Sequence, residues 1–182
     1  MVPILSTPRL RLAAPQAGDL NDIYAIFSDP VVMRYWSHAP WQSRVEAEAW
    51  LARVENGHAT GDAVQWAIRE MASGAVIGTI TLFKINTANH RAEIGYALAQ
   101  RAWGVGYMAE ALRAVIDHAF GSMALHRLEA DIDPRNEGSA HALGRQGFIC
   151  EGILRQRWCV GGEWSDTGLY GLLATDWAAR AG

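Results

Sequence analysis

The sequence predicts an α+β fold in which helices flank a mixed, mainly antiparallel sheet of six to seven strands. Strand-like and helical stretches do not alternate regularly along the chain, as they would around a parallel sheet. Near the middle, three strand-like stretches follow one another over short polar connections, which favours antiparallel pairing of neighbours. No repeat or linker divides the chain, so we expect a single domain over residues 1–182.

The elements of the N-terminal half follow from the spacing of apolar residues. Residues 8–14 alternate with period two, as in a strand, and an apolar stripe of helical spacing follows over 20–27. Ser43 and Glu46 form a capping box ahead of a second helix, which we expect to end at Gly57. Three strands are expected next, over 64–71, 76–85 and 91–98.

Helical spacing returns in the C-terminal half. A long apolar stripe covers 105–119 and indicates the central helix of the chain. A strand is expected over 127–132 and a short helix over 138–145. The last two stretches, 148–160 and 164–173, are separated by two adjacent glycines, which is typical of a hairpin.

Composition excludes several classes of protein. The 182 residues are 50% hydrophobic and 19% charged, which excludes wholesale disorder, and a net charge of −3 argues against a nucleic-acid partner. No apolar run nears the roughly 18 residues of a bilayer span, and the first residues do not resemble a signal peptide. Cys150 and Cys159 form neither a disulfide framework nor a metal-binding spacing. We therefore expect a cytoplasmic protein with no membrane partner and no metal.

The most informative segment is a glycine turn that joins a strand to the central helix. Gly104 and Gly106 let the backbone approach a ligand, and the first N–H groups of a helix favour phosphate. One alternative is a turn that only connects two elements. Another is a dinucleotide-binding fingerprint that continues to Ala109, with Asp131 or Asp133 on the ribose, although that fingerprint normally belongs to a parallel sheet.

A wider set of motifs resembles the GNAT superfamily of N-acetyltransferases. In order along the chain these motifs are Thr7-Pro-Arg-Leu-Arg-Leu12, Glu93-Ile-Gly-Tyr96, Arg101-x-x-Gly104-x-Gly106, Asn136-x-x-Ser139 and Gly162-Glu-Trp-Ser-Asp166. Together they resemble the branch of ribosomal-protein N-terminal acetyltransferases from about residue 7 to residue 177. The resemblance implies a GNAT-like fold.

The resemblance also implies acetyl-CoA as cosubstrate and a direct attack of the acceptor amine on its thioester. Pantetheine would pair with the backbone of Tyr96, Ala97 and Leu98. Asn136 would reach the pantetheine arm or the thiol end. The pyrophosphate would lie on the loop and first helical turn, at Arg101, Gly104, Val105, Gly106, Tyr107, Met108 and Ala109.

Two residues are candidates for proton transfer. Glu93 shares a strand face with the small residues Gly95 and Ala97 and is the candidate base, unless it pairs with a neighbouring cation such as Arg91. Many members of the superfamily use a tyrosine as the acid, but the matching position here is Leu143. Ser139 is the nearest hydroxyl and hence the candidate acid, with a helix cap as the alternative role.

The acceptor is expected to be a primary amine. Tyr35, Trp36 and Trp41 are candidates to line its pocket, the alternative being that they fill the core. Neutralising a lysine, with a pKa of about 10.4, costs about 3 kcal/mol more than neutralising an α-amine with a pKa of about 7.7–8.0. We therefore expect a protein N-terminal α-amine. A small-molecule amine, a non-catalytic CoA-binding module and assembly into a homodimer remain open.

Overall fold

The computed structural model describes residues 2–180, which form one eight-stranded sheet with helices on both faces. The strands are β1 (Leu5–Ser6), β2 (Leu10–Ala13), β3 (Ala63–Glu70), β4 (Val76–Asn86), β5 (Arg91–Leu98), β6 (Arg127–Ile132), β7 (Ile149–Val160) and β8 (Glu163–Leu173). The helices are α1 (Leu20–Phe27), α2 (Arg44–Thr60), α3 (Tyr107–Phe120), α4 (Glu137–Gln146) and α5 (Ala174–Arg180). The predicted α+β fold is confirmed, and the strand beyond the expected six to seven is the two-residue β1.

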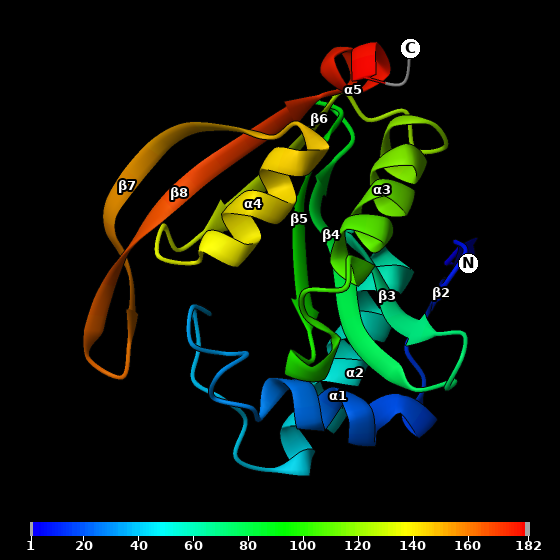
Figure 1. Ribbon diagram of the computed structural model, residues 1–182, viewed down its shortest axis with the longest axis vertical. Coiled ribbons are helices and arrows are strands. Elements are labelled where there is room, and N and C mark those ends of the chain that lie inside the picture. The colour runs from blue at the N-terminus through cyan, green and yellow to red at the C-terminus, as the bar shows by residue number, and fades with distance from the viewer. Residues whose placement is uncertain (1, 181–182) are drawn as a thin grey trace.

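The sheet is antiparallel except at one pair of strands. Its order is β1-β2-β3-β4-β5-β6-β8-β7, and only β5 and β6 run parallel. The crossover between them is the central helix α3, which packs on the near face of the sheet with α4, while α2 covers the far face (Figure 1). This arrangement does not support the dinucleotide-binding alternative, which needs a series of parallel strands.

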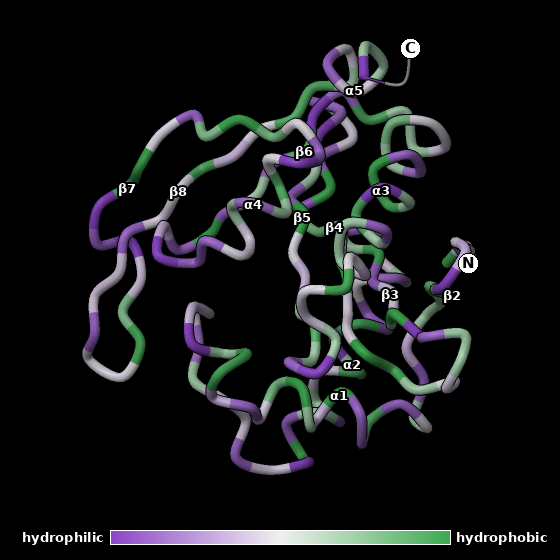
Figure 2. The backbone as a smooth tube through the Cα atoms, in the orientation of Figure 1, coloured by the Kyte–Doolittle hydropathy of each residue, from purple (hydrophilic) through white to green (hydrophobic). Residues whose placement is uncertain are grey.

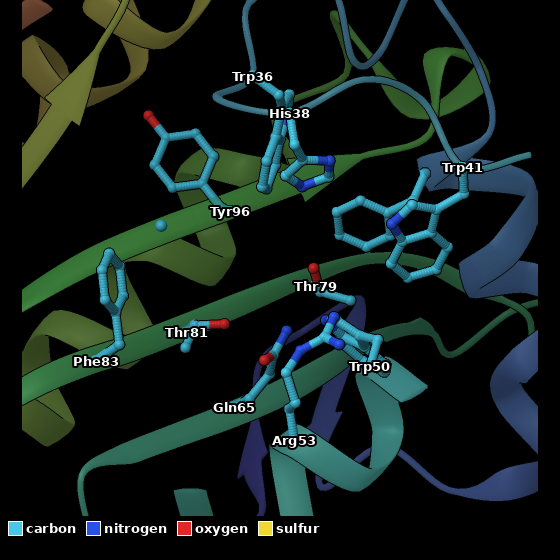
Figure 3. Close-up of a pocket in the computed structure, with 12 residues that line it drawn as sticks. Trp36, His38, Trp41, Trp50, Arg53, Gln65, Thr79, Thr81, Phe83 and Tyr96 are labelled. Carbon is cyan, nitrogen blue, oxygen red and sulfur yellow. The ribbon is translucent and has the colours of Figure 1, made fainter. Parts of the chain in front are cut away.

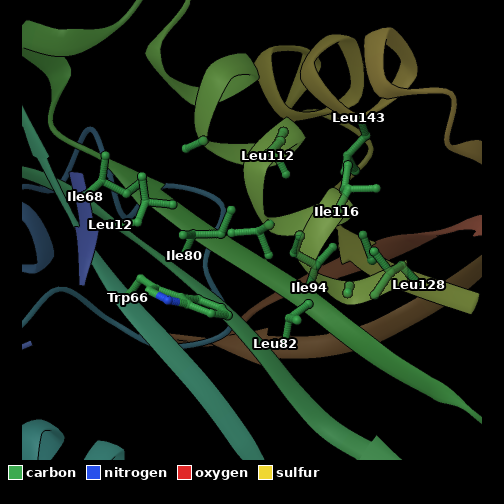
Figure 4. Close-up of a cluster of buried hydrophobic side chains, with 14 of the residues drawn as sticks. Leu12, Trp66, Ile68, Ile80, Leu82, Ile94, Leu112, Ile116, Leu128 and Leu143 are labelled. Carbon is green, nitrogen blue, oxygen red and sulfur yellow. The ribbon is translucent and has the colours of Figure 1, made fainter. Parts of the chain in front are cut away.

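Two hydrophobic cores hold these layers together. One lies between the sheet and the helices α3 and α4, and Figure 4 shows Ile80 and Ile94 of the strands facing Leu112 and Ile116 of α3. The other lies under α1 and α2 on the opposite face. Leu143 of α4 is fully buried in the first core. The residue at the position that matches the family's catalytic tyrosine therefore packs in the hydrophobic core.

Two helix boundaries differ from the sequence-based prediction. Helix α2 does not end at Gly57 but continues to Thr60 and ends at Gly61, whose φ of +80° is the left-handed conformation of a C-cap. Gly57 lies inside the helix, where a Cβ would come within 3.2 Å of the Ala63 side chain. Helix α3 begins at Tyr107, so Val105 belongs to the preceding turn and is 52% exposed.

The last two strands extend beyond the rest of the sheet. The β7–β8 hairpin turns at Gly161 and Gly162, as predicted, and runs away from the helices in Figure 1. Hydrophobic and hydrophilic residues follow one another along it in Figure 2. Cys150 and Cys159 are both free and exposed on β7. Within residues 2–180 no helix has the length and apolarity that crossing a membrane requires.

Candidate active site

The two parallel strands separate part of the way along their length. Residues Arg91–Glu93 of β5 pair with Arg127–Glu129 of β6, and the pairing stops there. On its other side β5 stays paired with β4 up to Leu98. One edge of the second half of β5 therefore lacks a neighbouring strand, and we call this place the β5–β6 fork. Exposed strand edges bind extended ligands through backbone hydrogen bonds.

The pairing of β5 with β4 determines which backbone groups point into the fork. The Ala99 amide donates to the Ile77 carbonyl at 2.8 Å. Hydrogen-bonded and non-hydrogen-bonded pairs alternate along an antiparallel ladder, so the pair Ala97–Thr79, two residues further, is also hydrogen-bonded. The backbone of Ala97 is thus directed at β4 and not at the fork, contrary to its expected role in binding pantetheine.

The neighbours of Ala97 have the opposite orientation. The backbone groups of Tyr96 and Leu98 point into the β5–β6 fork by the same alternation. The Leu98 carbonyl accepts a hydrogen bond from the Trp103 indole N–H at 2.7 Å. The Tyr96 N–H and carbonyl and the Leu98 N–H have no hydrogen-bond partner among the described residues. They form a short row of free backbone groups along the fork.

The glycine turn leads from the end of β5 into α3. Gly104 and Gly106 have φ values of +76° and +88°, which residues with a Cβ rarely adopt. The first hydrogen bond of the helix is donated by Glu110 to the Gly106 carbonyl. The N–H groups of residues 104–109 donate no backbone hydrogen bond outside regular helices and strands within residues 2–180. Six free N–H groups at the positive end of a 14-residue helix fit a phosphate group.

The turn is held in place by the N-terminal strand β2. The Arg9 guanidinium donates to the Val105 carbonyl at 3.0 Å and lies 4.5 Å from the centre of the Tyr107 ring. It also forms an ion pair with Glu110 at 2.7 Å. Burial alone would raise the pKa of Glu110, but hydrogen bonds from Thr7 and Arg9 outweigh it and hold this pKa below its usual value. The motif at residues 7–12 therefore anchors the first turn of α3.

Two other residues expected at the cofactor have partners within the chain. The Arg101 guanidinium is 3.4 Å from the Val76 carbonyl and lines a second cavity, beside Asp29. Asn136 is the N-cap of α4, because its Oδ1 accepts from the Ser139 amide at 3.1 Å. Ser139 is therefore not itself the cap, and no described residue hydrogen-bonds its hydroxyl.

A second hydroxyl lies next to Ser139. The Tyr96 hydroxyl donates to the Ser139 carbonyl at 3.3 Å. Burial raises the pKa of Tyr96 well above its usual value, so this phenol stays protonated throughout the neutral range. The contact of the Tyr96 side chain could not be predicted, because nothing local in the sequence indicates that the ring reaches α4.

A cavity of about 190 Å³ opens beside the fork, on the face covered by α1 and α2 (Figure 3). Four aromatic side chains form one wall: Phe27 stacks on Trp41 with centroids 4.7 Å apart and meets Trp36 edge-on at 5.3 Å, and Trp50 follows. The remaining lining residues are His38, Arg53, Gln65, Thr79, Thr81, Phe83, Gly95 and Tyr96. None of these described residues is acidic.

The acceptor-pocket candidates divide accordingly. Trp36 and Trp41 line the cavity, but Tyr35 does not; its ring instead lies 5.4 Å from the guanidinium carbon of Arg34 and 5.8 Å from that of Arg135. Glu93 lies outside the lining as well. Its carboxylate forms an ion pair with Lys84, at 2.8 and 3.0 Å, and not with Arg91.

The cavity contains a titratable group that the sequence analysis did not single out. The Nδ1 atom of His38 is 2.9 Å from the Ala39 carbonyl, and the ring centre is 5.6 Å from that of Trp36. A donating Nδ1 leaves Nε2 as a proton acceptor. Within residues 2–180 no cluster of three His, Cys, Asp or Glu side chains could hold a metal ion.

Comparison with known proteins gives a consistent result. A family model described as "Acetyltransferase (GNAT) domain" matches residues 9–149. The chain is 32% identical over 174 residues to "Uncharacterized N-acetyltransferase p20" of Bacillus licheniformis, covering 96% of this chain and 98% of that one. It is 25% identical over 173 residues to the spermidine N(1)-acetyltransferase of Vibrio cholerae, covering 95% and 98%.

A solved structure extends this comparison to the fold. The crystal structure of the ribosomal-protein-S5-alanine acetyltransferase of Vibrio fischeri superposes with a TM-score of 0.83 at 25% identity, covering 96% of this chain and 98% of that one. Members of the matched family use acetyl-CoA, and the free N–H groups of the glycine turn and the fork suit its phosphates and its extended arm. The chain thus belongs to the GNAT acetyltransferases and is an acetyl-CoA-dependent N-acetyltransferase.

Proposed function

We propose that the protein acetylates the N-terminal α-amine of a polypeptide. The observation that carries this proposal is the lining of the cavity beside the β5–β6 fork, which offers aromatic walls and one arginine but, among the described residues, no carboxylate. A polyamine carries further ammonium groups away from the one that reacts, and each would need a counter-charge in such a site. The α-amine of a peptide whose first side chain carries no amine needs none, because it is the only amine near the reacting centre and reacts in the neutral form.

Two of the relatives with named acceptors represent the two classes of amine. One is named for spermidine and the other for an alanine of a ribosomal protein. Relatives of the two classes match this chain at similar identities, 25% and 28%, so the choice between the classes depends on the cavity of this chain. Its charge favours the peptide class.

For the cosubstrate we propose the binding mode that the free backbone groups allow. The diphosphate would accept hydrogen bonds from the N–H groups of residues 104–109, and the pantetheine arm would run along Tyr96 and Leu98 in the fork. The amide of Asn136 would contact the same arm from the start of α4, since its Nδ2 atom has no hydrogen-bond partner within residues 2–180. Arg101, at the end of β5, would add a positive charge near the phosphates.

Deprotonation of the amine is assigned to Glu93, directly or through a water molecule. The carboxylate shares a strand face with Gly95, which lines the cavity. Lys84 forms an ion pair with this carboxylate and must give up part of the contact for an ammonium group to approach. His38 is the alternative acceptor, since its Nε2 atom is free inside the cavity.

Protonation of the leaving thiolate is assigned to Ser139 at the start of α4. Its hydroxyl has no hydrogen-bond partner among the described residues, and its amide is fixed by Asn136. Tyr96 is the second hydroxyl at this place and contacts the Ser139 carbonyl. Leu143, one turn further along α4, is buried and supplies no proton donor.

A comparison of acceptors tests the proposed function. The purified protein is incubated with acetyl-CoA and either short peptides with a free N-terminus and an amidated C-terminus, or spermidine, and the released thiol is followed. We expect kcat/KM to be at least tenfold higher for the better peptides. Turnover of spermidine with no turnover of any peptide would refute the proposal.

A further inference from the structure

The aromatic cavity also contains a group of hydrogen-bond donors that the chain itself does not use. Arg53 of α2, Gln65 of β3 and Thr79 of β4 all line the cavity, and Figure 3 shows their side chains close to Trp50. No described residue forms an ion pair with Arg53 or a hydrogen bond with the side chain of Gln65 or Thr79. Thr79 is only 2% exposed, and it lines the same cavity.

Within residues 2–180, seven arginines form ion pairs with carboxylates, and Arg53 is not among them. Arg9, Arg69, Arg91, Arg127 and Arg135 all form ion pairs with carboxylates at 2.7 Å or less. Arg44, on the same helix as Arg53, pairs with Glu48 at 3.9 Å. The carboxylate of Glu93, which shares the face of β5 that borders the cavity, is already paired with Lys84. The positive charge at the mouth of the cavity is therefore not compensated by an acidic residue within 4 Å among residues 2–180.

From these contacts we infer that the acceptor carries a carboxylate close to its amine. Arg53 and the Gln65 amide bind this carboxylate, with the Thr79 hydroxyl as a further donor, and the tryptophan wall holds the carbon skeleton. Charge-assisted hydrogen bonds to a guanidinium are among the stronger polar contacts in proteins. The inference rests on the proposed function and narrows its substrate class: a peptide that begins with Asp or Glu presents this chemistry, and so does a free amino acid.

The test compares acceptors that differ only in the charge of one group. Peptide amides beginning with Asp and with Asn are isosteric, and we expect a KM that is about 10- to 100-fold lower for Asp, corresponding to one charge-assisted hydrogen bond. Free aspartate and its diamide form the second arm, which distinguishes the two sources of the carboxylate. The wild-type comparison needs no variant and stays informative even if a substitution impairs folding.

Substitution of the arginine then assigns the effect to this site. Arg53→Gln is expected to abolish the preference for Asp by raising the KM for Asp about 10- to 100-fold and leaving the KM for Asn unchanged. Arg44→Gln on the same helix is the matched control and should behave as the wild type. Arg53→Glu should reverse the preference in favour of an acceptor with a second ammonium group.

The outcomes separate this inference from the proposed function. Equal KM values for Asp and Asn acceptors, or equal behaviour of Arg53→Gln and Arg44→Gln, would overturn the inference even if peptides are good substrates. Turnover of carboxylated small amines with inert peptides would refute the peptide proposal and support the inference. Turnover only of acceptors that lack a carboxylate would overturn it.

Discussion

Replacing Gly106 by alanine tests the assignment of the glycine turn most sharply. Gly106 is the N-cap of α3 and has a φ of +88°. A Cβ there would lie 3.5 Å from an Arg9 nitrogen, which is an ordinary contact. The backbone conformation, and not steric crowding, therefore disfavours a side chain at this position. A non-glycine residue in this conformation costs about 1–2 kcal/mol. If the turn relaxes to avoid this strain, at least one N–H loses its direction toward the phosphates. Loss of one charge-assisted hydrogen bond weakens binding by about 10- to 100-fold.

Gly61 supplies a matched control for this experiment. It caps α2 with a φ of +80°, and a Cβ there would meet nothing within 4 Å. Gly61→Ala and Gly106→Ala should therefore lose similar free energy of unfolding, measured by urea denaturation without ligand. Calorimetric titration with CoA should show the loss of affinity only for Gly106→Ala. Equal CoA affinity of the two variants would refute the role of the turn.

Three further predictions concern protons. Glu93→Gln should lower kcat/KM mainly on the acid side of the pH profile, where little free amine is present. If Glu93→Gln leaves the profile unchanged and His38→Gln abolishes its acid limb, the base is His38 and not Glu93. Ser139→Ala should lower kcat roughly 100-fold without changing the KM for acetyl-CoA, and a larger loss in Tyr96→Phe would assign the acid to Tyr96. Glu110→Gln should lower the free energy of unfolding more at pH 7 than at pH 2. The pKa of Glu110 is lower in the folded protein than in the unfolded chain. Its contribution to the free energy of unfolding is therefore present above the unfolded pKa and is lost as the pH falls through the folded pKa. An equal loss at both pH values would contradict this assignment.

Features encoded by local spacing were predictable from the sequence. The periods of apolar residues gave the strands and helices, and the paired glycines gave both the turn before α3 and the end of the last hairpin. The predicted end of α2 at Gly57 and the predicted start of α3 at Val105 were wrong. Neither a glycine inside a helix nor a valine just before one carries a local sequence signal for that position. The close approach of Ala63, which lies beyond the turn after α2, leaves little room for a side chain at Gly57.

Contacts between distant segments could not be read from spacing. Regular alternation suggested Arg91 as a partner of Glu93, but the ladder between β4 and β5 is interrupted between Phe83 and Asn86, and Lys84 there has a φ of +49°. This irregularity accompanies the contact between the ammonium group of Lys84 and Glu93. A period-two argument assumes an uninterrupted ladder and so misses the pair.

For the same reason, only part of the cavity lining could be predicted from the sequence. Trp36 and Trp41 lie in one loop and could be recognised as a cluster. Arg53, Gln65 and Thr79 come from a helix and two strands, and only the packing of α2 on the sheet brings them together. The side of the cavity that we propose to select the substrate is therefore a property of the tertiary structure.

Amide hydrogen exchange with and without CoA tests the central claim most directly. In the free protein the amides of residues 104–109 and of Tyr96 have no hydrogen-bond partner among the described residues and should exchange rapidly. The account predicts that saturating CoA slows exchange in 104–109 and at Tyr96 and leaves the turn at Gly161 and Gly162 unchanged. Binding of CoA that leaves the amides of 104–109 exchanging as before would contradict it.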